Sequence, residues 1–108
     1  MTDDELLKLA GKAGGLKWGG DTFYDKFGPL IEWNPLQYIG DAIGLAIDLR
    51  LSMHINDRAA WVHQDDESMV GDTAASSMVM FSETGYNKYR ALRRAITLAA
   101  AEIGRRIK

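Results

Sequence analysis

The two histidines are the residues best suited to proton transfer or metal binding at neutral pH. His54 and His63 fall in two stretches with the pattern of β-strands, separated by a turn that contains Asp57. If the strands pair, the rings can meet and, with the carboxylate, hold a metal or run acid–base chemistry. No further ligand stands at a metal-site spacing, so we interpret both as polar-face strand residues. We expect no metal and no enzymatic activity.

Aromatic rings and arginines form the second group with binding chemistry. Rings stack on bases or nucleotides, and guanidinium groups clamp phosphates. The alternative is that the rings fill the core, which we expect of Trp33 and Trp61 and leave open for Tyr24 and Tyr38. The predicted ligand- or partner-binding residues are Trp18, Tyr24, Tyr38, Arg90, Arg93 and Arg94.

Two other patterns fall short of a known ligand site. The acidic residues within 65–72 lack the alternating spacing of a calcium loop, and we interpret them as a solvated hairpin loop. The glycine pairs at 14–15 and 19–20 are not followed by the Lys-Ser or Lys-Thr pair of a phosphate loop. We therefore expect no cofactor.

Length and composition indicate one globular domain of 108 residues, with 46% apolar and 26% charged side chains. Cysteine is absent, which excludes disulfides, thiolate zinc sites and cysteine nucleophiles. No apolar run approaches the roughly 18 residues that a membrane span requires. Because the N-terminus is acidic, whereas signal peptides begin basic, we expect a cytoplasmic location.

The net charge of −2 hides an uneven distribution. Residues 88–108 carry seven basic side chains and one acid, while residues 1–87 carry six basic and fourteen acidic ones. The basic end, residues 88–108, is either an anion-binding face or is neutralised by the acidic body, residues 1–87. We favour neutralisation, because charge runs on helices are usually solvated faces.

Sequence patterns predict the elements that position these groups. Thr2 and Glu5 have capping-box spacing and two glycines follow, so a helix is predicted over residues 3–13. Residues 16–35 form an irregular aromatic segment, in which a short strand fits near residues 30–33. A second helix follows Pro35, and its predicted apolar face consists of Ile39, Ile43, Ala46, Ile47 and Arg50.

Alternating side chains then predict strands over residues 51–56, 59–63 and 77–82, with a turn at 56–58. A final helix is predicted over 87–106, with an apolar stripe that runs from Tyr89 to Ile107. The fold class is thus α+β: a three-stranded antiparallel meander packed with helices in a two- or three-layer sandwich. Residues 36–108 form an α-β-β-β-α core whose topology resembles a double-stranded-RNA-binding domain, and residues 1–35 add a helix and the aromatic segment to the same domain.

Three stretches resemble a known family. Trp33-Asn34-Pro35-Leu36, followed by Gly40-Asp41-Ala42, resembles the signature of small phage proteins of the NinX-like type. The tail from Arg93 to Gly104 and the opening from Glu5 to Ala10 are similar to the same family. The resemblance implies an accessory gene used during infection, and hence a location inside the bacterial host cell. It assigns no reaction and no catalytic residue.

Two classes of function remain after the enzyme is set aside. The one we favour is a non-catalytic protein that binds and neutralises a host component, most simply in counter-defence. It would either capture a small anionic nucleotide-like immune signal or block a host defence protein, and the acidic body fits a basic target. The alternative is a nucleic-acid-binding module that uses the basic C-terminal helix. Assembly into a homo-oligomer stays open.

Overall fold

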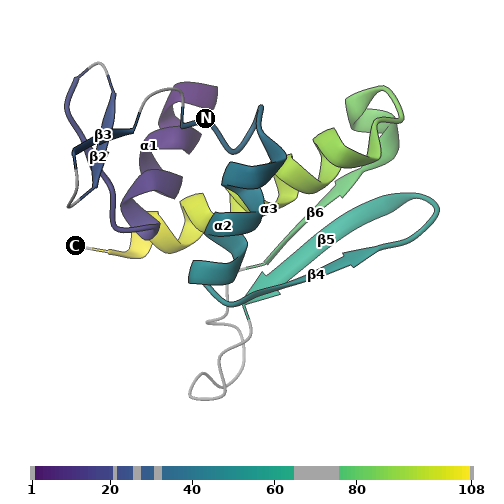
Figure 1. Ribbon diagram of the computed structural model, residues 1–108. Coiled ribbons are helices and arrows are strands. Elements are labelled where there is room, and N and C mark those ends of the chain that lie inside the picture. The colour runs from purple at the N-terminus through teal and green to yellow at the C-terminus, as the bar shows by residue number, and fades with distance from the viewer. Residues whose placement is uncertain (1, 21, 26–27, 31–32, 65–75, 108) are drawn as a thin grey trace.

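The computed structural model describes residues 2–20, 22–25, 28–30, 33–64 and 76–107, and it confirms the α+β fold class. Within these residues, helices alternate with two separate three-stranded antiparallel sheets (Figure 1). The elements are α1 (Asp3–Ala13), β1 (Lys17–Trp18), β2 (Phe23–Asp25), β3 (Gly28–Leu30), α2 (Ile39–Asp48), β4 (Leu51–Ile55), β5 (Ala59–Gln64), β6 (Ser76–Met80), a 3₁₀ turn (Phe81–Thr84) and α3 (Lys88–Arg106). The predicted order of helix, three strands and helix is present as α2, β4, β5, β6 and α3. The acidic loop predicted within 65–72 lies outside the described residues.

Helix α1 has the predicted bounds because local signals define both of its ends. Thr2 Oγ1 accepts a hydrogen bond from the N–H of Glu5 (3.2 Å), and the acidic first turn suits a helix N-terminus. Beyond Ala13, Gly15 adopts a φ of +82°. Glycine takes this left-handed conformation without strain, so the chain can turn away from the helix.

The aromatic segment folds into a small sheet of its own, β1-β2-β3, beside α1 (Figure 1). The strand predicted near residues 30–33 instead covers Gly28–Leu30, and residues 31–32 lie outside the described part. Phe23 is the buried residue of this sheet. Its ring lies where a Cβ on Gly11 would stand, so the absence of a side chain at Gly11 lets the sheet approach α1.

Helix α2 forms after Pro35, but only part of the predicted apolar face faces the core: Ala46 is buried and Ile43 packs against the core. Its buried residues are Ala42, Leu45 and Ala46. Ile39 is exposed, and Ile47 exposes 69% of its surface. The face that meets α3 carries small residues and one leucine, which allow the helices to approach closely. The sequence prediction relied on the spacing of apolar residues, and this spacing favoured the larger isoleucines.

The second sheet, β4-β5-β6, is the predicted meander. Asn56 Oδ1 accepts hydrogen bonds from the N–H groups of Arg58 (2.8 Å) and Ala59 (2.9 Å), and this stabilises the β4–β5 turn as predicted. β6 ends at Met80, two residues before the predicted end, because the chain turns into the 3₁₀ segment at Phe81.

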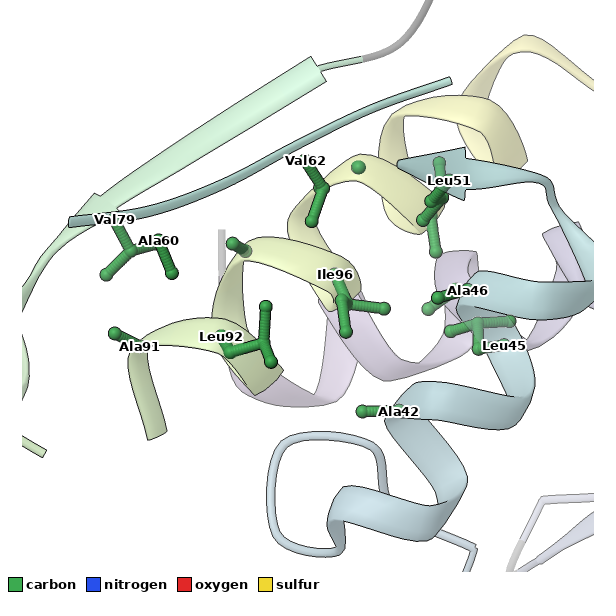
Figure 2. Packing of buried hydrophobic residues seen from close by; sticks show 14 of the residues in the cluster. Ala42, Leu45, Ala46, Leu51, Ala60, Val62, Val79, Ala91, Leu92 and Ile96 are labelled. Carbon is green, nitrogen blue, oxygen red and sulfur yellow. The ribbon is translucent and has the colours of Figure 1, made fainter. Parts of the chain in front are cut away.

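Helix α3 is the central element of the molecule. Alternate residues of the sheet, including Ala60, Val62 and Val79, point toward Ala91, Leu92 and Ile96 of α3 (Figure 2). Helix α2 meets another side of α3 through Ala42, Leu45 and Ala46. Helix α1 packs along α3 in parallel, since Asp3 pairs with Arg94 and Leu9 lies against Gly104.

Three aromatic and apolar side chains depart from the expected burial. Trp33 packs against the core as predicted, but Trp61 is only half buried, on the sheet face turned away from α3. Tyr89 in the first turn of α3 exposes 68% of its surface, and Ile107, which follows the end of the helix, exposes 41%. The stripe on α3 is therefore shorter at both ends than predicted.

Candidate functional site

The predicted binding rings Trp18 and Tyr24 lie on opposite faces of the small sheet. Trp18 pairs with Phe23 across the strands, and the rings are 4.9 Å apart. Tyr24 is the next residue, so its side chain points to the other face, where its ring covers Gly19. Trp18 borders a hollow of about 320 Å³ with Lys8, whose ammonium lies 5.3 Å from the ring centre. The two rings therefore do not form one stacking platform.

The predicted arginines lie near one another on α3, away from these rings. Arg93 Nε donates to the carbonyl oxygen of Leu36 (3.0 Å), which ties α3 to the turn before α2. Arg94 lies 3.5 Å from Asp3 Oδ1. Arg90, Arg94, Asp3 and Leu36 line a hollow of only about 100 Å³, while the exposed Tyr38 stands before α2 as its cap residue. No described hollow is lined by both the predicted rings and the predicted arginines.

The basic end of the chain is partly neutralised by its own acid. Glu102 accepts from Arg105, with a shortest contact of 2.7 Å, and lies 3.3 Å from Arg106. The hydrogen bond from Arg105 is the main cause that lowers the pKa of Glu102, and the positive charges of both arginines add to it. With Arg93 and Arg94 also engaged, four of the basic side chains of residues 88–108 have partners within the protein.

An acidic hollow beside α2 is the site that sequence reasoning missed. Its volume is about 250 Å³, and it is open to solvent. Three parts of the chain contribute carboxylates or a ring to it. Asp25 comes from β2, and Trp33 comes from the segment before the Asn34-Pro35 turn. Asp41 and Asp48 come from α2. The lining residues are Gly14, Leu16, Asp25, Trp33, Gly40, Asp41, Gly44, Leu45 and Asp48. No lysine or arginine is among these described lining residues.

Local contacts fix the positions of two side chains that line the acidic hollow. Asp41 Oδ2 accepts from the N–H of Asn34 (2.9 Å), and Asn34 Oδ1 accepts from the N–H of Leu36 (3.0 Å). These bonds fix the Asn-Pro turn against the start of α2. Trp33 is held edge-on to Phe23, with ring centres 4.9 Å apart. The hollow therefore has a positioned carboxylate and a positioned aromatic wall.

Two glycines on α2 place no side chain in the acidic hollow. Gly40 and Gly44 are one helical turn apart, and no atom of the described residues lies within 4 Å of a Cβ built on either. Within the described part of the chain, neither glycine is therefore needed for close packing, and both leave space beside α2. The sequence signal was the spacing of Gly40 and Gly44 alongside Asp41 and Asp48, whereas Asp25 and Trp33 join them only in the tertiary structure.

The two histidines meet on the outer face of the main sheet. His54 Nε2 lies 3.2 Å from His63 Nε2, and the His54 ring also stacks on Trp61. Asp57 lies in the turn and is not part of the pair. Across the described ranges, no group of three His, Cys, Asp or Glu residues is placed to hold a metal ion.

Comparison with known proteins adds no identification: no family model, curated protein or solved structure matches this chain. The resemblance at Trp33–Leu36 to NinX-like phage proteins accordingly stays a prediction. In the part of the chain described, no helix is long and apolar enough to cross a membrane.

Proposed function

We propose that this protein is a non-catalytic phage accessory protein that binds a basic surface of a host protein, such as a defence complex, and blocks it. The acidic hollow beside α2 is the observation that carries the proposal. It combines the carboxylates of Asp41 and Asp48 with one aromatic wall and two glycines of α2, and the hollow is open to solvent. This chemistry fits an arginine or lysine side chain of a partner.

The donor set of the hollow matches a guanidinium group. Carboxylates accept paired N–H donors, and an aromatic face attracts a cation. One oxygen of Asp41 accepts a hydrogen bond from the N–H of Asn34, but a carboxylate has about four acceptor positions in total. Residues 1–87 carry fourteen acidic side chains against six basic ones, so the wider surface steers a basic partner toward the site.

Capture of a small anionic ligand has weaker support. That version needs rings and arginines around one space, but Trp18 and Tyr24 face away from each other and Arg90 and Arg94 border a hollow of about 100 Å³. Nucleic-acid binding by the basic helix is favoured only by the exposed Lys88 and Arg90 at the start of α3. The double-stranded-RNA-binding likeness rests on element order, which does not assign a function.

Paired variants test the proposal. The wild-type protein, an Asp41→Asn/Asp48→Asn variant and an Asp4→Asn/Asp57→Asn control would each be used to capture proteins from bacterial lysate at low and high salt. Both variants remove two negative charges, but only the first changes the hollow. We expect a salt-sensitive partner that the hollow variant loses and the control keeps. The interaction would then be reconstituted with the purified partner, and alanine replacement of its arginines should abolish it.

Three results would overturn the proposal. Equal loss in both variants would mean that net charge alone attracts partners. Retention by the hollow variant would place binding elsewhere. The third result is that the wild-type protein captures RNA or DNA, that the amount captured falls steeply with salt, and that the Lys88→Gln/Arg90→Gln variant captures none. This result would support the nucleic-acid alternative.

A further inference from the structure

The two histidines are neighbours because of the strand register. His54 pairs with Trp61, and His63 pairs with Ser52. His54 and His63 are therefore diagonal partners on one face of the β4–β5 pair, within reach of each other's side chains. That face is opposite the one that packs on α3, which carries Ala60 and Val62.

The separation of the two ring nitrogens suits a shared metal ion. The Nε2 atoms lie 3.2 Å apart. Two nitrogens that each stand about 2.0–2.1 Å from one tetrahedral zinc ion lie roughly 3.3 Å apart. The separation of the two Nε2 atoms would thus hardly change if a metal ion replaced the hydrogen bond between the rings.

The rings are also positioned in advance. The His54 ring lies nearly parallel to Trp61 (11°) and nearly parallel to His63 (15°). His54 is exposed and His63 is half buried, so an ion can reach both from solvent. Rings already held near the bound geometry lose little conformational freedom when a metal binds.

We propose that His54 and His63 form a two-histidine site for a divalent transition metal such as zinc, nickel or copper, bound through both Nε2 atoms. Imidazole nitrogen favours these ions over magnesium and calcium, which take oxygen ligands. With no third protein ligand among the described residues, the ion keeps open positions for water or for a donor from another molecule. The site shares no residue with the acidic hollow, so its test is independent of the proposed function.

The test uses the fact that these are the only two histidines in the chain. Every imidazole signal in an NMR spectrum of the ¹⁵N-labelled protein comes from this pair. Zinc chloride titration should shift both Nε2 resonances together at a one-to-one ratio. Calorimetry should show the same stoichiometry, and His54→Gln and His63→Gln should each lower the affinity at least about tenfold. Magnesium chloride should leave the ring signals unchanged.

The double variant His54→Gln/His63→Gln controls for binding by acidic side chains, and its circular dichroism spectrum checks that it folds. If it binds zinc as tightly as the wild type does, or if zinc fails to shift the ring signals of the wild type, the proposal is wrong. A shift of one ring without the other would also overturn it. The wild-type titration decides the question even if a variant does not fold.

Discussion

At the scale of single residues, one acid does most to compensate the basic end of the chain. Glu102 lies within reach of Arg105 and Arg106, and its side chain keeps about a third of its surface exposed (32%). Arg93 and Arg94 turn instead toward Leu36 and Asp3. The contacts with the carboxylates of Glu102 and Asp3 reduce the positive field that the phosphates of a nucleic acid would meet.

The lowered pKa of Glu102 predicts a pH-dependent effect on stability. A carboxyl whose pKa is lower in the folded than in the unfolded state stabilises the fold above its ordinary value of 4.5 and loses that contribution as the pH falls through the lowered value. The Glu102→Gln variant should therefore unfold at a lower urea concentration than the wild type at pH 7. The difference should vanish below the lowered pKa and shrink in high salt. A difference that is independent of pH would contradict this prediction.

At the scale of elements, the pairing of α1 with α3 depends on one glycine. A Cβ on Gly104 would overlap the carbonyl oxygen and carbonyl carbon of Leu9. Backbone atoms of α1 cannot yield as a flexible side chain can. The two helices therefore approach closely at this point only because residue 104 has no side chain.

Replacement of Gly104 by alanine should destabilise the protein by about 1–3 kcal/mol, because the helices must separate. Gly44→Ala is the matched control: it also lies in a helix, but a Cβ there meets open space. It should stabilise α2 by about 0.5–1 kcal/mol while narrowing the acidic hollow. Thermal and urea unfolding of both variants would measure these effects. Equal effects at the two positions would show that helix propensity, not packing, dominates.

At the scale of the whole molecule, α3 organises the core. Its buried side chains are mostly alanines, so α1, α2 and the β4-β5-β6 sheet can all come close to its axis. Leu92 and Ile96 are the large exceptions, and Ile96 is fully buried and lies between the sheet and α2 (Figure 2). The acidic hollow and the histidine pair lie on separate outer surfaces around this core.

Ile96→Ala should cost about 2–5 kcal/mol of unfolding free energy, because it leaves a cavity among small neighbours that cannot fill it. Ile47→Ala removes the same atoms from an exposed position and should cost less than about 1 kcal/mol. Urea unfolding monitored by circular dichroism would compare the two. A similar loss in both would mean that the packing around Ile96 is not the main source of stability.

Sequence patterns predicted the elements that local chemistry controls. The Thr2 cap, the Asn56 turn and the alternation along β4 and β5 each act over a few residues, and each was read correctly. The alternation also placed both histidines on one face, which let their meeting be foreseen. The buried face of α2 was predicted only in part, because burial there depends on which side chains fit against α3 rather than on their hydropathy.

What the sequence determined by itself was the α+β class, the order of the core elements and the uneven charge, since these follow from local propensity and composition. Only the tertiary structure decided that Trp18 and Tyr24 face apart, that Asp25 and Trp33 join Asp41 and Asp48 around one hollow, and that the histidine nitrogens stand 3.2 Å apart. These arrangements join residues of different elements. Their geometry depends on how helices and sheets pack, which no local pattern encodes.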